Sequence, residues 1–396
     1  MKYIIVVGDG MADWGIEAFG GKTPLEYART PYIDYLAARS ELGMANMVPE
    51  ELPPASDIGN MSILGADPIV YQCGRGAIEA LANPAIVLRN NDSVYRCNFV
   101  CINDNNMVDY SGGGITSEQA NILINDLNMY FKDSFTFYAG VDYRNLLIYP
   151  DGPLEGIITM PPHNISGKPI QEFLPTGPHA EKLIDIINRA RQFLSSHTLV
   201  QEQSKKNTSF ANALWLWGHG GRPHFPNFKE QFNLRGAVIT AVDIVRGLAV
   251  GMGFDIIPVD GATGRVDTNY EGKAAAALKA QKEYDFIFIH VEATDESGHA
   301  GDAEEKVRGI ENLDQRLIRP LIEGLGDTDF RFLFLPDHPT PCAIGKHTNE
   351  LVPYLLFDSR SSGCIAERRY TEATGRASGV VFNKGHLLIR HLLEQE

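Results

Sequence analysis

The stretch YIIVVGD at residues 3–9 decides the fold, because it is a short apolar run that ends abruptly in a carboxylate. An apolar run of this length is typical of a strand that is buried on both faces of a parallel sheet. In open α/β sheets, ligands bind beyond the carboxyl ends of the strands. We therefore expect Asp9 to lie at a ligand-binding edge of the sheet.

Further apolar runs follow along the chain, and helical patterns separate most of them. This alternation predicts an α/β fold with a parallel central sheet flanked by helices. The predicted strands are LWLWG (214–218), AVIT (237–240), DIIPV (255–259), DFIFIHV (285–291), FRFLFL (330–335) and LVPYLLF (351–357).

The middle of the chain differs in composition from both ends. Residues 84–225 contain more Asn, Ser and Pro, shorter apolar runs, and turn clusters such as NNDS and SGGG. We interpret this stretch as a second domain inserted into the first. The predicted boundaries are therefore 1–83 and 226–396 for the first domain, and 84–225 for the second.

Charge and composition exclude several classes of function. The chain has 396 residues and a formal net charge of −15, which disfavours a nucleic-acid partner. Its first apolar run is too short for a signal peptide, and no run approaches the roughly 18 residues of a membrane span. Five cysteines, an odd number in a large chain, argue against a disulfide scaffold. We expect a cytoplasmic protein without a membrane partner, with free thiols at Cys73, Cys97, Cys101, Cys342 and Cys364.

Acidic residues and histidines follow several of the predicted strands. If those strands are neighbours, three Asp and three His side chains converge at one edge of the sheet. Such a mixed carboxylate and imidazole set suits Mn²⁺, Zn²⁺ or Mg²⁺. Six ligands exceed the needs of one tetrahedral ion and suggest two ions about 4 Å apart. Taken singly, each residue could equally be a helix cap or an ordinary loop side chain. The six residues are Asp9, Asp295, His299, Asp337, His338 and His347.

The segment PPASDIGNMSILG at residues 53–65 is a second candidate site. Ser56 precedes a predicted helix, where a serine is most often an N-cap. A helix N-terminus also attracts anions, and a hydroxyl bound to a divalent ion becomes a nucleophile. The chain lacks the HExxH and GxSxG motifs, which disfavours zincin proteases and α/β-hydrolases.

A series of short motifs then identifies one family. In chain order they are VVGDGMAD, SDIGNMSILGADP, GRGAIEAL, PPHNISGKPI, LWLWGHG, ATGRVDTNYEGKA, the D-x-x-x-H pair, PDHPTPC and KHTNELVP. Together they resemble the archaeal-type, cofactor-independent phosphoglycerate mutases, a branch of the alkaline phosphatase superfamily. The likeness extends from Lys2 to about residue 385. The chain departs from it at Asn164, where relatives often carry Asp, and at residues 110–112, which replace a more basic stretch.

The resemblance implies an alkaline-phosphatase-like central sheet with a smaller α/β substrate-binding domain inserted. It implies a glycolytic isomerase that interconverts 3-phosphoglycerate and 2-phosphoglycerate through a phosphoserine, without 2,3-bisphosphoglycerate. Two divalent metal ions are implied, manganese first, with magnesium, zinc or cobalt as alternatives. Ser56 matches the nucleophile. The implied ligands are Asp9, Ser56, Asp337 and His338 for one ion, and Asp295, His299 and His347 for the other.

The same resemblance implies a small phosphorylated three-carbon acid as the substrate. Basic residues within the matched motifs are candidates to hold its phosphate and carboxylate, and arginine is favoured for its bidentate fork. Each could instead be a solvated charge or one half of a surface ion pair. The candidates are Arg75, Arg96, Arg144, His163, Arg222 and Lys273.

Two other functions stay open at the level of the sequence. A metal-dependent phosphatase, or another phosphomutase of the same superfamily, would keep the same metal ligands, because fold and metals do not fix the substrate. A non-catalytic metal-binding protein would be expected to have lost Ser56 or several ligands, and all are present. The sequence does not decide between a monomer and a homo-oligomer.

Overall fold

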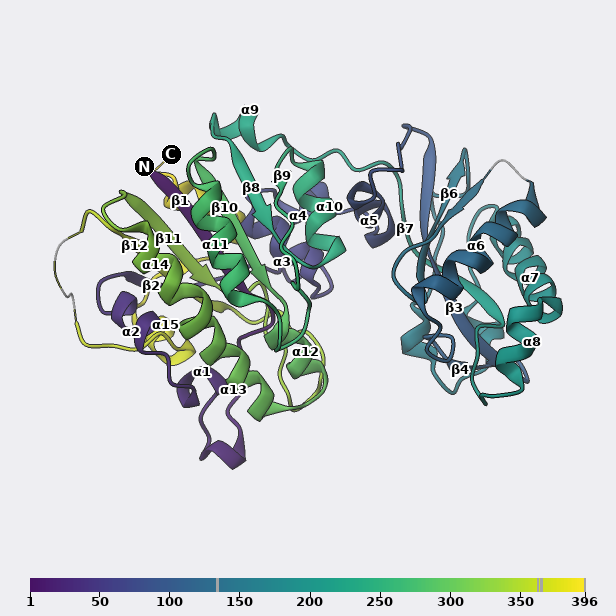
Figure 1. Ribbon diagram of the computed structural model, residues 1–396, viewed down its shortest axis with the longest axis horizontal. Coiled ribbons are helices and arrows are strands. Elements are labelled where there is room, and N and C mark those ends of the chain that lie inside the picture. Colours follow the sequence, from purple (N-terminus) through teal and green to yellow (C-terminus); the bar gives the residue numbers. More distant parts are fainter. Residues whose placement is uncertain (133–134, 362, 364–365, 395–396) are drawn as a thin grey trace. The chain divides into compact units, whose positions relative to one another are not determined.

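The computed structural model describes residues 1–132, 135–361, 363 and 366–394 (Figure 1). The chain divides into two compact units, Met1–Gln72 with His224–Glu396, and Cys73–Pro223. The second unit begins upstream of residue 84 because α5 (Arg75–Ala82) packs on strands β3 (Asp92–Asn103) and β7 (Ala213–Gly220).

The first unit contains a central sheet of eight strands within the described residues. Strand β1 (Lys2–Gly8) lies between β10 (Phe286–Val291) and β11 (Phe330–Leu335), and it is parallel to both. The expected α/β fold is confirmed, but the sheet is mixed, because β12 runs antiparallel to β11 and to β2. In spatial order the strands are β13 (Val381–Phe382), β2 (Glu41–Ala45), β12 (Val352–Asp358), β11, β1, β10, β8 (Gly236–Ile239) and β9 (Asp255–Ile256).

Helices cover the sheet of the first unit. Alternate residues of β1, such as Ile4 and Val6, are buried in a core shared with α2, α11, α13 and α14. In Figure 1, α11, α13 and α14 lie in front of the strands. The helices are α1 (Pro24–Tyr27), α2 (Pro31–Ala37), α3 (Ser56–Ile63), α4 (Pro68–Tyr71), α9 (Phe228–Phe232), α10 (Asp243–Gly251), α11 (Tyr270–Ala280), α12 (Ala293–His299), α13 (Ala303–Asn312), a π-helical segment (Leu313–Ile318), α14 (Arg319–Leu325), α15 (Glu372–Ala377) and α16 (Leu388–Leu392).

The second unit is built on a smaller antiparallel sheet. Strand β3 pairs with β4 (Asn106–Asp109), with β6 (Arg144–Pro150) and with β7, and β6 pairs with β5 (Thr136–Tyr138). Helices α6 (Ser117–Phe131) and α7 (Ala180–Ser196), with α8 (Thr198–Ser204), bury one face of this sheet. A smaller apolar cluster that includes Trp215 and Trp217 covers the other face.

Two global expectations concern membranes and cysteines. Among the described residues, no helix combines the length and the apolar character that crossing a membrane requires. No disulfide joins the four described cysteines, Cys73, Cys97, Cys101 and Cys342. Cys364 lies outside the described residues.

Candidate metal centre and nucleophile

Acidic and imidazole side chains meet at the carboxyl ends of three neighbouring strands. Asp9 directly follows β1, and Asp337 stands two residues beyond β11. Asp295 lies in α12, which begins two residues beyond β10. Because β10, β1 and β11 are adjacent and parallel, segments far apart in the sequence reach the same edge of the sheet.

The first cluster of candidate ligands is built around Asp295. Donor atoms of Asp295, His338 and His347 all lie within 4.8 Å of one another. His299, one helical turn after Asp295, places Nε2 3.2 Å from Asp295 Oδ2 and 2.9 Å from His347 Nε2. His299 Nδ1 donates to the carbonyl of Gly345 at 2.9 Å, so once Nε2 has lost its proton, its lone pair faces the cluster.

Hydrogen bonds shift the pKa values of Asp295 and His299 in opposite directions. Burial raises the pKa of Asp295, but hydrogen bonds from His299 and His347 outweigh burial and hold that pKa well below its ordinary value. The hydrogen bond to Asp295 in turn raises the pKa of His299 to about 9, while burial opposes the change. A divalent cation would compete with protons for the same nitrogen lone pairs. Ion binding at the first cluster is therefore expected to release protons.

The second cluster of candidate ligands consists of Asp9, His290 and Asp337, whose donor atoms also lie within 4.8 Å of one another. His290 Nε2 is 3.0 Å from Asp9 Oδ2. His338 stands between the two clusters, because its Nε2 also lies 3.6 Å from Asp9 Oδ1 and 3.4 Å from Asp337 Oδ2. The structure therefore brings all six sequence-predicted ligands together, and His290 joins them.

The second cluster has the chemistry of a cation site. Within the described residues, neither carboxylate oxygen of Asp9 and neither ring nitrogen of His290 has a hydrogen-bond partner of normal geometry. Burial, and then the charges of Asp337 and Asp295, raise the pKa of Asp9 well above its ordinary value. Buried polar atoms without partners are costly, and a divalent cation accepts this mixture of oxygen and imidazole ligands. The residues therefore fit a bound divalent ion.

Ser56 is the first residue of α3, and its hydroxyl faces the candidate ligands. The N-cap of this helix is Ala55, which makes no side-chain capping hydrogen bond, so Ser56 is not the cap that the sequence allowed. Ser56 Oγ lies 3.3 Å from His338 Nε2. The first N–H groups of a helix have no partner within the helix and carry partial positive charge. The hydroxyl is thus next to a candidate cation site and to a favourable position for phosphate.

Side chains one turn into α3 hold the helix against the loop that follows β11. Asn60 Nδ2 donates to the carbonyl of Ser56 at 2.9 Å and to Asp337 Oδ2 at 2.8 Å. Gly59 permits this approach, since a Cβ at that position would lie 2.5 Å from the carbonyl oxygen of Asp337. The motif SDIGN therefore fixes the distance between the serine and the candidate ligands.

Five of the six predicted substrate-binding residues lie in the second unit. Two of them, Arg96 and His163, contact the Trp217 ring. The Arg96 guanidinium is 4.4 Å from the centroid of the Trp217 ring, and the His163 ring packs edge-on against it with centroids 5.6 Å apart. Arg96 is buried and forms an ion pair with Glu79, with Nε 2.9 Å from Glu79 Oε2. Burial lowers the pKa of Arg96, the charge of Glu79 opposes this, and the charges of Arg75 and Arg144 lower it further. The charges of Arg75 and Arg144 thus act on Arg96, whose own charge is already paired with Glu79.

Arg222 and Lys273, the remaining predicted substrate-binding residues, do not contact the Trp217 ring in the described contacts. Arg222 is exposed and donates to Asn90 Oδ1 at 3.0 Å. Lys273 is buried in the first unit, where its Nζ donates to the carbonyl of His290 at 2.6 Å. Burial lowers the pKa of Lys273 to about 8, although Glu292 opposes the change. Lys273 therefore lies beside the second cluster without offering an exposed charge.

His290 is the candidate ligand that reasoning from the sequence missed. It lies within the apolar run DFIFIHV, and such a residue is interpreted as part of a buried strand. Its position in the sequence could have identified it, because His290 is the last residue but one of β10 and other candidate ligands follow that strand. A polar residue at that position of a parallel strand is close to the ligand-binding edge.

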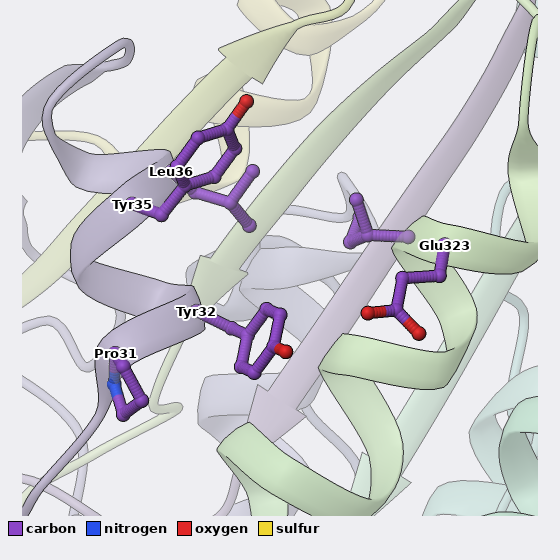
Figure 2. Close-up of a pocket in the computed structure, with 6 residues that line it drawn as sticks. Pro31, Tyr32, Tyr35, Leu36 and Glu323 are labelled. Atoms are coloured by element: carbon purple, nitrogen blue, oxygen red, sulfur yellow. The ribbon is translucent and has the colours of Figure 1, made fainter.

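The first unit also contains a hollow of about 540 Å³ that none of these residues lines (Figure 2). It lies between α2 and α14, and Figure 2 shows Tyr32 and Glu323 on opposite sides of it. The lining has one carboxylate and no cationic side chain, so it does not suit a phosphorylated acid. The lining residues are Pro31, Tyr32, Tyr35, Leu36, Ile322 and Glu323.

Comparisons with known proteins show which family the chain resembles. Residues 1–382 match the Metalloenzyme superfamily. The chain is 42% identical to a probable 2,3-bisphosphoglycerate-independent phosphoglycerate mutase of Geobacter sulfurreducens, with 100% of each chain covered. It is 40% identical to the 2,3-bisphosphoglycerate-independent phosphoglycerate mutase of Methanosarcina barkeri, again with 100% of each covered. The structure of PH0037 protein from Pyrococcus horikoshii superposes with a TM-score of 0.82 at 27% identity, covering 99% of this chain and 96% of that one.

Proposed function

The chain belongs to the archaeal-type 2,3-bisphosphoglycerate-independent phosphoglycerate mutases of the metalloenzyme superfamily, and from that premise we propose that this isomerase works through a phosphoserine at Ser56. The reaction interconverts 3-phosphoglycerate and 2-phosphoglycerate, a step of glycolysis. One observation carries the proposal: the Ser56 hydroxyl lies 3.3 Å from His338 Nε2, the imidazole nitrogen between the two candidate ion sites.

Two divalent ions, manganese in first place, are proposed to occupy the two clusters. When bound, they neutralise the transferring phosphoryl oxygens and favour ionisation of a nearby hydroxyl. His290, whose Nε2 lies 3.0 Å from Asp9 Oδ2, is proposed as a further ligand at the second cluster. The proposed ligands are Asp9, Ser56, Asp337 and His338 for one ion, and Asp295, His299 and His347 for the other.

The proposed reaction consists of two phosphoryl transfers, the first to Ser56 and the second from Ser56 back to glycerate. Ser56 Oγ attacks the phosphorus of the bound phosphoglycerate, the Oγ–P bond forms, and the bond from phosphorus to the substrate oxygen breaks. The serine proton ends on the departing glycerate hydroxyl. Glycerate reorients without leaving, its other hydroxyl attacks the phosphoserine, and Ser56 regains a proton. Asn60 keeps Ser56 in place throughout, through its hydrogen bonds to the Ser56 carbonyl and to Asp337.

The second unit is proposed as the substrate-binding domain. Its cluster of Arg75, Arg96 and Arg144 with His163 provides charge-assisted donors for the phosphate or the carboxylate. Arg222 is a further proposed substrate-binding residue of this unit. Lys273 is also proposed to bind substrate, but it lies in the first unit, buried beside His290.

A coupled mutase assay without 2,3-bisphosphoglycerate tests this function. Wild-type enzyme is expected to lose turnover in EDTA and to regain it with Mn²⁺, whereas Ser56→Ala has almost none. Ser62→Ala is the matched control, because Ser62 lies on the same helix but donates to the carbonyl of Met47 instead. Release of inorganic phosphate without isomerisation would favour a phosphatase. Full turnover of Ser56→Ala would contradict the phosphoserine.

A further inference from the structure

Thr340 connects the two clusters of candidate ligands. It is fully buried, and its Oγ1 lies 2.5 Å from Asp295 Oδ1 and 3.3 Å from His338 Nδ1. An ionised carboxylate can only accept hydrogen bonds, so the hydroxyl proton of Thr340 points to Asp295. The hydroxyl oxygen is then left to accept the proton on His338 Nδ1.

This orientation favours the tautomer of His338 that is protonated at Nδ1. A neutral imidazole carries one N–H, and when Nδ1 holds it, Nε2 has a free lone pair. That lone pair faces Ser56 Oγ at 3.3 Å, Asp337 Oδ2 at 3.4 Å and Asp9 Oδ1 at 3.6 Å. The other tautomer would direct an N–H toward the proposed ion and could not coordinate it.

The surrounding backbone holds Thr340 in position. Its N–H donates to the carbonyl of Ala12 at 3.2 Å, and its carbonyl accepts from Lys306 Nζ at 2.8 Å. Gly10 provides the space, since a Cβ there would lie 2.4 Å from both Thr340 Oγ1 and Asp295 Oδ1. The loop after β1 thus encloses the hydroxyl.

We propose that Thr340 is a positioning residue that joins the two ion sites: its hydroxyl binds Asp295 of one site and fixes the Nε2-coordinating tautomer of His338 of the other. This inference rests on the proposed function, since it assumes that the two clusters bind ions. Loss of the hydroxyl frees the His338 ring to adopt the wrong tautomer and removes one of the hydrogen bonds to Asp295. Outer partners of metal ligands typically change affinity by about 10–100-fold.

Manganese titration followed by electron paramagnetic resonance measures this effect on the whole protein. Wild type is expected to bind two ions. Thr340→Val, which keeps the shape without the hydroxyl, should bind them about 10–100-fold more weakly. Thr340→Ser restores the hydroxyl and should recover most of the affinity. Thr348→Val is the matched control, because the Thr348 hydroxyl is enclosed but has no hydrogen-bond partner in the described residues.

The outcomes separate this inference from the function on which it rests. Wild type that binds no Mn²⁺ would overturn the proposed ion sites and the inference together. Wild type that binds two ions, with Thr340→Val equally tight, would overturn the inference alone. If Thr340→Val folds poorly, a measurement on wild type alone still tests the inference: nitrogen NMR of ¹⁵N-histidine in the metal-free enzyme should show His338 protonated at Nδ1. A proton at Nε2 would refute the role of Thr340.

Discussion

Replacing Lys306 by Met removes one partner of a buried ion pair. The Lys306 and Asp13 side chains are 0% and 1% exposed, and Nζ lies 2.8 Å from Asp13 Oδ2. Nζ also donates to the carbonyls of Ala12 at 3.3 Å and Thr340 at 2.8 Å. The lysine therefore joins the loop after β1 to the loop after β11, which carry candidate ligands. Lys306→Met leaves the Asp13 carboxylate buried without a cation.

The expected loss of stability is large for a single substitution. Removing one partner of a buried pair costs about 3–5 kcal/mol, because the other charge stays uncompensated. Since 1 kcal/mol corresponds to about 2–4 °C for a unit of this size, the first unit should melt about 6–20 °C lower. Differential scanning calorimetry of the metal-free protein measures this directly.

A matched variant on the same helix provides the control. Arg308 pairs with Glu305 at 3.9 Å, and these side chains are 56% and 34% exposed. Arg308→Met should therefore cost less than about 1 kcal/mol. Adding Asp13→Asn to Lys306→Met should recover part of the loss, because no buried charge remains. If Lys306→Met melts within the range of Arg308→Met, the buried pair does not hold these loops together and the reasoning fails.

Three further predictions follow from other parts of the molecule. Adding Mn²⁺ to EDTA-treated protein should raise the melting temperature of the first unit in a concentration-dependent way, because the ion binds only the folded clusters; a scanning fluorimetry titration without a shift would contradict this. Burial raises the pKa of Asp314 to about 6, so this carboxyl contributes stability below pH 4 that is lost as the pH rises to about 6. Asp314→Asn should remove about 2–3 kcal/mol of that pH dependence in urea melts at pH 4 and pH 7, and an unchanged pH profile would refute the shift. Arg144→Met should raise the KM for 3-phosphoglycerate about 10–100-fold with little change in melting temperature, because Arg144 is exposed and its guanidinium lies over the Tyr143 ring, 4.8 Å from the ring centroid; an unchanged KM would remove it from the proposed site.

The position of the candidate metal centre could be predicted from the sequence for a physical reason. Parallel strands align their carboxyl ends, so residues that follow such strands meet at one edge. Asp9, Asp295 and Asp337 obey this rule directly, because β1, β10 and β11 are neighbours. The rule needs no knowledge of side-chain packing, and it therefore works without a structure.

Other features depend on packing that a single sequence does not display. The strand at Val352–Asp358 is antiparallel, although its apolar run is like those of the parallel strands. Lys273 was expected to reach substrate as a positive charge, yet its ammonium is buried against the carbonyl of His290. Thr340 gains its position from Asp295, which is 45 residues away in the chain. Such contacts arise only when distant loops fold against one another.

Anomalous diffraction from crystals grown with Mn²⁺ would test the central claim most directly. We predict two manganese peaks at the edge of the central sheet, one touching Asp9, Asp337 and Ser56 and the other touching Asp295, His299 and His347. His338 should coordinate through Nε2. Peaks located elsewhere, or a single peak that leaves Ser56 without a manganese contact, would contradict the two-ion phosphoserine site.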